Sequence, residues 1–268
     1  GYLDRVALRD AWNHAVARHA ILRTRFADRH GGVPQQVVMR HVDLPWTEHD
    51  WSGLGDAAYA EQFARWMTDD RRQGFDPSVA PLLRIDLFDR PDGAVDFVWT
   101  DHHALLDGWG SAELLGQVMS DYQARVANRP AALPEVTPYR NYVAWLQRQG
   151  DALDWWREQV AQRHEPATLT ASLPAPERPE TGTFAHRLAL GEEASTHIRM
   201  AARHHGVTVN TVMQGAWALL LARYGNASQV TFGVTMSGRP AGLPGIDRML
   251  GLFINSLPLW VDVPASMD

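Results

Sequence analysis

Residues 101–110, which read Asp-His-His-Ala-Leu-Leu-Asp-Gly-Trp-Gly, form the densest polar cluster of the chain. An alternating, strand-like run ends just before this cluster, and a helical pattern begins at its end. Because side chains alternate between the two faces of a strand, His102 and His103 are expected to point in opposite directions. We therefore expect one imidazole to be buried and the other to face a cleft. Asp107 could fix the turn by pairing with an arginine, or it could orient an imidazole.

Other chemistries fit the sequence less well than a histidine site. Adjacent histidines on a strand are poor co-ligands because their rings diverge, and the chain has neither an HExxH nor an HxH pattern, so we expect no metal site. The chain has no cysteine, which excludes disulfides, iron–sulfur clusters and a cysteine nucleophile. All 25 basic residues are arginine, which excludes Schiff-base chemistry on a lysine. A Gly-x-Ser-x-Gly elbow and a phosphate-binding glycine loop are also absent.

The composition is that of a folded globular protein. The 268 residues are 45% hydrophobic and 21% charged, and the mean hydropathy is -0.29. With a formal net charge of -6, the chain lacks the excess of basic residues that is typical of nucleic-acid-binding proteins. We therefore expect no nucleic-acid partner. The sequence has no run of about 18 apolar residues and no secretory signal pattern. We therefore expect a cytoplasmic protein with no membrane partner.

The order of helical and strand-like segments predicts a mixed α/β fold in two successive lobes. We expect an N-terminal lobe over 1–165, a proline-rich linker over 166–182 and a partial C-terminal lobe over 183–268. The apolar helix predicted over 209–224 is expected to be buried on most sides. Spacing predicts further helices over 4–20, 55–73, 110–126, 139–149, 153–162 and 192–205, and strands over 21–26, 33–42, 83–87, 95–99, 183–190 and 230–234.

Residues 102–109 resemble the HHxxxDG signature of the condensation domains of nonribosomal peptide synthetases, which have a chloramphenicol-acetyltransferase-like fold. Further segments resemble other motifs of that family, in the family's order. Residues 18–26 resemble RHExLRTxF with Ala20 in place of Glu, residues 139–145 resemble YxDYxxW with Asn141 in place of Asp, residues 237–240 resemble a Ser-Gly-Arg-Pro-like loop, and residues 251–258 resemble GxFVNT. Together these segments span nearly the whole chain, so the resemblance implies the two-lobe mixed sheet of that family.

The resemblance implies an acyltransferase that forms peptide bonds. A condensation domain joins an acyl or peptidyl group on an upstream carrier domain to the amine of an aminoacyl group on a downstream carrier domain. Both substrates are thioesters of phosphopantetheine arms, so the resemblance implies no cofactor bound by the domain itself. It also implies an adjacent adenylation domain as a partner.

The resemblance further implies a role for each site residue. By its place in the signature, His103 would be the catalytic histidine that contacts the attacking amine. Asp107 would pair with Arg23 and hold the loop in shape. The remaining site residues would be His102 and Gly108, which shape the active site, and Trp109 and Asn255, which line the substrate tunnel.

The chain also departs from the family's pattern. The family's first motif and its last two are absent, so we expect a domain truncated at both ends, with the second lobe partial. Asp101 replaces a frequent apolar or His residue, and Gly110 replaces a frequent Ser. Leu105-Leu106 and Ala20 resemble the subtype that accepts a D-configured donor.

Two other function classes stay open on the sequence. The first is a different acyltransferase of the same fold, which would use a soluble amine or alcohol as the acceptor. The second is an inactive fragment or a recruitment domain that retains the signature without turnover. Soluble acceptors in the assay would identify the first class, and carrier binding without turnover would identify the second.

Overall fold

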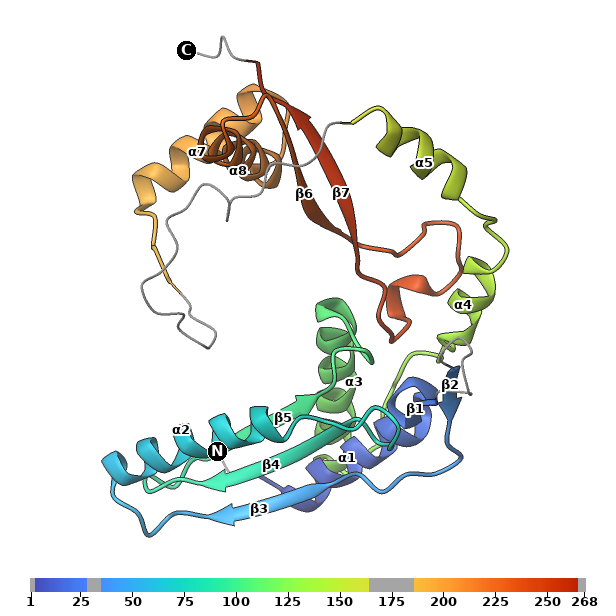
Figure 1. Cartoon of the computed structure of the whole chain (residues 1–268). Coiled ribbons are helices and arrows are strands. Elements are labelled where there is room, and N and C mark those ends of the chain that lie inside the picture. The colour runs from blue at the N-terminus through green and yellow to red at the C-terminus, as the bar shows by residue number, and fades with distance from the viewer. Residues whose placement is uncertain (1–2, 28–34, 164–185, 265–268) are drawn as a thin grey trace. The chain divides into compact units, whose positions relative to one another are not determined.

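The computed structural model describes residues 3–27, 35–163 and 186–264, and the chain forms two compact units (Figure 1). The first unit is Gly1–Gly150 with Ser237–Ile254, and the second is Asp151–Met236 with Asn255–Asp268. This division differs from the expected lobes, because the chain returns to the first unit after Met236 instead of staying in the second. The expected linker over 166–182 lies outside the described residues.

A three-stranded sheet organises the first unit. β4 (Leu83–Asp89) lies between β3 (Trp46–Asp50), to which it is parallel, and β5 (Val95–Asp101), to which it is antiparallel. The predicted β4–β5 hairpin is confirmed, and Gly93 adopts the left-handed φ of 77° that its tight turn requires. A separate antiparallel pair joins β1 (Thr24–Ala27) to β2 (Gln35–Val38).

Helices supply the rest of the first unit, and most follow the predicted spacing. Side-chain caps begin two of them, because Asp4 accepts a hydrogen bond from the Ala7 N–H at 2.9 Å and Asp107 accepts one from the Gly110 N–H. The helices are α1 (Arg5–Arg18), α2 (Asp56–Gln73), α3 (Gly108–Val126) and α4 (Arg140–Leu146), with 3₁₀ turns η1 (Ala20–Arg23) and η2 (Ile246–Arg248).

The two faces of β4 are covered by different helices, as its alternating side chains require (Figure 1). Ile85 and Leu87 are fully buried in the main core, which they share with residues of α1 and α3. Phe88 points to the opposite face, where its ring lies 5.1 Å from that of Phe63 and 4.7 Å from that of Trp66, both on α2. This layered packing holds the end of β5 and the start of α3 on one rigid frame.

The second unit is built around a two-stranded antiparallel ribbon. Its elements are α5 (Leu153–Ala161), α7 (Glu192–His204), α8 (Val209–Gly225), β6 (Gln229–Met236) and β7 (Asn255–Asp262). Ala218 and Ala222 of α8 pack against Val230 of β6, but most other apolar side chains of α8 are exposed. The expectation that this helix is buried on most sides is therefore wrong for the described residues, because the ribbon covers only one of its faces.

Local packing explains the other differences from the predicted elements. The first half of the strand predicted over 21–26 is the turn η1, because Ile21 and Leu22 both pack into the same core, whereas a strand would direct adjacent side chains to opposite faces. Residues 186–190, the described part of the strand predicted over 183–190, are not a strand. Among the described helices, none combines the length and apolar character needed to cross a membrane.

Candidate active site

The two histidines of the signature lie just beyond the end of β5, in the turn that leads to α3. The backbone N–H of His102 donates to the Leu82 carbonyl at 2.9 Å, and the Leu105 N–H donates back to the His102 carbonyl at 2.9 Å. The chain leaves the strand at Asp101, so both histidines belong to the turn and not to β5. His102 is partly buried and His103 is exposed, and both line one shallow cavity of about 420 Å³. The expected difference between the two imidazoles is therefore found in part, because His102 is the more buried residue, with its ring 6.4 Å from that of Phe75, but it is not fully enclosed.

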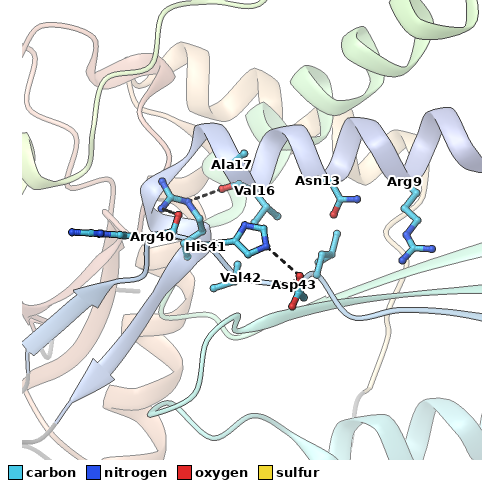
Figure 2. A pocket seen from close by; sticks show the side chains of 10 residues that line it. Arg9, Asn13, Val16, Ala17, Arg40, His41, Val42 and Asp43 are labelled. Atoms are coloured by element: carbon cyan, nitrogen blue, oxygen red, sulfur yellow. Dashed lines mark hydrogen bonds and ion pairs between the residues drawn. The ribbon is translucent and has the colours of Figure 1, made fainter.

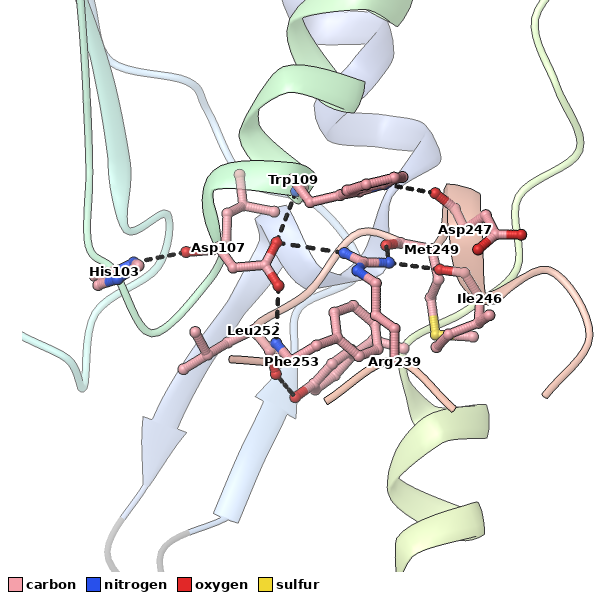
Figure 3. A network of polar contacts seen from close by, with 12 residues as sticks. His103, Asp107, Trp109, Arg239, Ile246, Asp247, Met249, Leu252 and Phe253 are labelled. Carbon is pink, nitrogen blue, oxygen red and sulfur yellow. Dashed lines mark hydrogen bonds and ion pairs between the residues drawn. The ribbon is translucent and has the colours of Figure 1, made fainter. Parts of the chain in front are cut away.

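Hydrogen bonds give the two imidazoles opposite tautomers. His103 Nδ1 lies 2.7 Å from the Leu106 carbonyl oxygen, which can only accept, so Nδ1 carries the proton (Figure 3). In the neutral ring the lone pair of His103 then lies on Nε2. His102 Nδ1 accepts from the Ala104 N–H at 3.1 Å, so Nδ1 of that ring has no proton. His103 is thus oriented to offer Nε2 as an acceptor, whereas the acceptor nitrogen of His102 already accepts the hydrogen bond from the Ala104 N–H.

Asp107 is a buried anchor between the start of α3 and the loop over 237–254. Only 2% of Asp107 is exposed. Its Oδ1 accepts from the Gly110 N–H at 2.7 Å and from Arg239 Nη2 at 3.3 Å, and its Oδ2 accepts from the Phe253 N–H at 3.2 Å (Figure 3). The backbone N–H of Asp107 also donates to the Gly251 carbonyl. These bonds explain why residues 237–254 belong to the first unit.

The arginine that pairs with Asp107 is Arg239, not the expected Arg23. The side chain of Arg239 is 7% exposed, donates to the carbonyls of Ile246 and Met249, and lies 3.9 Å from the centre of the Phe253 ring. The resemblance pointed to the loop that contains Arg239 but assigned that residue no role. Arg239 lies in a loop far along the chain from Asp107, and no local sequence pattern predicts that these two residues pair.

Arg23 is held instead by backbone carbonyls of α1 and of the segment after β2. Its guanidinium donates to the carbonyl of Val16 at 3.1 Å and to those of Met39 and Arg40. These contacts tie η1 to the segment that follows β2. Arg23 also lines a second cavity of about 420 Å³, between α1 and residues 40–44, in which His41 pairs with Asp43 (Figure 2). The structure therefore gives Arg23 a local structural contact away from Asp107.

Gly108 and Trp109 form the first turn of α3 next to the histidine turn. Gly108 is exposed, and its backbone N–H has no acceptor among the described residues. Trp109 is 60% exposed, and its Nε1 donates to the Asp247 carbonyl at 2.8 Å. Asn255 belongs to the second unit, where it begins β7, pairs with Met236 and is exposed.

Sequence reasoning missed the contribution of Tyr139 to this region. The Tyr139 hydroxyl donates to the Leu252 carbonyl at 2.6 Å, and burial raises its pKa to about 12. A Cβ on Gly251 would overlap the Tyr139 ring, so only glycine fits there without a shift. The YxDYxxW-like and GxFVNT-like segments therefore pack directly against each other, which neither segment reveals alone.

The polar groups of the site suit proton transfer. Within residues 3–27, 35–163 and 186–264, no three or more His, Asp or Glu side chains are grouped so that they could hold a metal ion. The groups that the site does offer are an imidazole acceptor, a buried ion pair and backbone amides. These groups suit proton transfer and the orientation of a nucleophile.

Comparisons with known proteins identify the family of the chain. The family model for the condensation domain matches residues 1–268. One of the linear gramicidin synthase proteins of Brevibacillus parabrevis is 38% identical over 268 residues, which are 99% of this chain and 5% of that protein. Chondramide synthase cmdD of Chondromyces crocatus is 39% identical over 274 residues, which are 99% of this chain and 7% of that protein.

Solved structures share the fold. The first condensation domain of the calcium-dependent antibiotic synthetase, in complex with a substrate analogue, matches with a TM-score of 0.76 at 22% identity over 98% of this chain and 61% of that one. The epimerization domain from the third module of tyrocidine synthetase B matches with a TM-score of 0.74 at 18% identity over 99% and 61%. The chain thus spans a small part of its curated relatives and about three fifths of these solved chains. The predicted α/β fold is confirmed, and the chain belongs to the condensation-domain family of nonribosomal peptide synthetases.

Proposed function

We propose that this chain carries the catalytic histidine of an acyltransferase that joins a carrier-bound acyl thioester to the amine of a carrier-bound aminoacyl thioester. The observation that carries the proposal is the hydrogen bond from His103 Nδ1 to the Leu106 carbonyl, which leaves Nε2 able to accept a proton. Family membership across residues 1–268 and similarity to peptide synthases such as linear gramicidin synthase support the same chemistry.

The proposed reaction exchanges a thioester bond for an amide bond. The amine nitrogen attacks the thioester carbonyl carbon, and a C–N bond forms while the carbonyl π electrons move to oxygen. His103 Nε2 accepts one proton from that nitrogen. When the carbonyl reforms, the C–S bond breaks and the sulfur leaves as a thiolate, which takes up the proton from His103. The products are the amide and a free thiol.

His103 acts in this proposal mainly by orienting the amine. A free α-amine has a pKa of about 8, so a sizeable fraction is neutral near pH 7 before it meets the protein. Transfer of a proton to a positioned base contributes about 10²- to 10⁴-fold to a rate. Alignment of two reactants contributes more, roughly 7–11 kcal/mol of the barrier. We therefore assign the proton transfer to a late stage of the attack.

The other predicted site residues have supporting roles. His102 holds the turn through Ala104, and the pair of Asp107 with Arg239 fixes the start of α3. The free N–H of Gly108 is proposed to face the developing oxyanion. Trp109 and Asn255 are proposed to contact the substrates, and Arg23 is proposed to stabilise the fold around η1.

The substrates and partners follow from the same proposal. Both thioesters would be carried on phosphopantetheine arms, one of an upstream and one of a downstream carrier domain. An adenylation domain would be adjacent, and the reaction would take place in the cytoplasm. Leu105 and Leu106 before Asp107 favour a D-configured donor. Both leucines are buried in the main core, so they would act on donor choice only through the shape of the turn.

The test uses the complete polypeptide that contains residues 1–268. The donor carrier is loaded with a labelled acyl group, and the acceptor is offered as an aminoacyl carrier, as a soluble amine or as a soluble alcohol. We expect amide on the acceptor carrier, detected by mass spectrometry, at a rate well above that with either soluble acceptor. Faster reaction with a soluble acceptor would contradict the proposal and favour the other acyltransferase class. Carrier binding without turnover would favour a recruitment domain.

A further inference from the structure

The cavity beside the two histidines contains charged groups that the proposed reaction does not use. It is lined by residues of the last turn of α2, of β4 and of the end of β5, together with the histidine turn. Four charged side chains line it in addition to His102 and His103: Asp70, Arg71, Arg84 and Asp101. The charge of a ligand that the cavity can bind depends on which of these side chains already have an ion-pair partner.

Asp70 and Arg84 compensate each other. Arg84 Nε donates to Asp70 Oδ1 at 2.6 Å, Arg84 Nη2 donates to the Asp70 carbonyl at 2.9 Å, and Thr100 Oγ1 donates to Asp70 Oδ2 at 3.0 Å. The Arg84 guanidinium also lies 4.3 Å from the centre of the Phe75 ring. Both side chains are largely buried, so this pair supports the wall of the cavity and leaves no net charge there.

Asp101 is different, because its carboxylate is uncompensated. It is the last residue of β5 and is partly buried, and it has neither a side-chain hydrogen bond nor an ion pair with any described residue. Burial raises the pKa of the Asp101 carboxyl, against a smaller lowering by positive charge on His103 and His102. A carboxylate that loses water without gaining a partner is costly, so a cation entering the cavity would be bound favourably.

The position of Asp101 limits which kind of cation could bind in the cavity. Arg71 is the other uncompensated charge of the cavity, but it is exposed on α2 and makes no ion pair with Asp101. A group that reacts at His103 must lie within hydrogen-bond reach of that ring. Asp101 precedes His103 by two residues, and both residues line the same cavity. Charge on His103 acts on the Asp101 carboxyl more strongly than charge on His102 does, so a cationic group bound next to His103 would lie near that carboxylate.

We propose that Asp101 binds the ammonium group of the acceptor substrate next to His103 and so selects an amine over a hydroxyl acceptor. The inference rests on the proposed function for the identity of the acceptor. No bond forms or breaks in this step, and the ammonium must still lose a proton before it attacks.

The experiment compares two acceptor probes that differ only in this group, alanyl-pantetheine and lactyl-pantetheine. Binding of each is measured by calorimetry to the complete polypeptide without donor, so no condensation is needed. The variants are Asp101→Asn, which removes the charge at nearly constant shape, and Asp101→Glu, which keeps it. Asp69→Asn is the matched control, because it removes one negative charge from the exposed face of the same end of α2.

We expect the parent protein to bind alanyl-pantetheine about ten- to a hundredfold more tightly than lactyl-pantetheine, as a charge-assisted hydrogen bond allows. Asp101→Asn should lose that preference, Asp101→Glu should retain much of it, and Asp69→Asn should retain all of it. An unchanged preference in folded Asp101→Asn would overturn the inference, even if the protein makes amides. A preference that depends on Asp101 in a protein that makes no amide would support the site and count against the proposed function instead.

Discussion

Replacing Arg239 by Met tests the buried ion pair that the structure assigns to Asp107. The change preserves much of the aliphatic volume but removes the guanidinium, and with it the ion pair and the bonds to the carbonyls of Ile246 and Met249. The carboxylate, 2% exposed, would keep only the backbone donors of Gly110 and Phe253. Breaking a buried pair from one side costs about 3–5 kcal/mol, so we expect a loss of that size in the free energy of unfolding.

Arg23→Met is the matched control. Arg23 donates to three backbone carbonyls, and Met39 and Arg40, which supply two of them, are exposed and can turn to water instead. We therefore expect a smaller loss of about 1–2 kcal/mol. If Arg23 were the partner of Asp107, the order of the two losses would be reversed.

A double-mutant cycle separates the two arginines more strictly than single losses do. Urea unfolding followed by circular dichroism would be measured for Asp107→Asn alone and with each arginine variant. We expect a coupling of about 1.5–3 kcal/mol between Asp107→Asn and Arg239→Met, and additivity within about 0.5 kcal/mol with Arg23→Met. Strong coupling to Arg23 together with none to Arg239 would refute the assignment.

Two further predictions concern stability. Gly251→Ala should lower the free energy of unfolding by about 1–3 kcal/mol, because the new methyl group overlaps the Tyr139 ring, whereas Gly116→Ala on the open face of α3 should raise it by about 0.5–1 kcal/mol. Equal effects in urea unfolding would contradict the packing. Burial lowers the pKa of His19 below its ordinary 6.5, so the unfolded chain binds the extra proton and stability should fall as the pH drops below about 6.5. His19→Asn should make the melting temperature less dependent on pH between about 7.5 and about 5.5, and an unchanged dependence would exclude His19 as its source.

Elements with a clear local period were predictable from the sequence. α3 and the β4–β5 hairpin follow helical spacing, strand alternation and a Pro-Asp-Gly turn, all of which act within a few residues. The strand predicted over 21–26 was only half right, because two adjacent apolar residues there both enter the core. β3 was not predicted, since its sequence Trp-Thr-Glu-His-Asp is mostly polar and its pairing with β4 comes from distant residues.

Part of the candidate site was predictable from one continuous segment of sequence, and the rest depends on contacts between residues far apart in the chain. His103 and Asp107 could be singled out because the signature is a continuous segment. The partner of Asp107 could not be chosen, because Arg239 lies 132 residues further along the chain and no pattern joins the two. The tautomer of His103 depends on the carbonyl of Leu106, and the placement of both histidines in a turn depends on where β5 ends. These features follow from the packed backbone and not from residue types.

Under the proposed function, amide formation depends on His103. The most direct measurement is the single-turnover rate of amide formation between loaded carrier domains in the complete polypeptide, for His103→Ala and for the control His205→Ala, an exposed histidine at the end of α7. We predict that His103→Ala remains folded and loses amide formation by on the order of 10²-fold or more, while His205→Ala keeps the parent rate. A folded His103→Ala protein that forms amide at the parent rate would contradict the role proposed for His103.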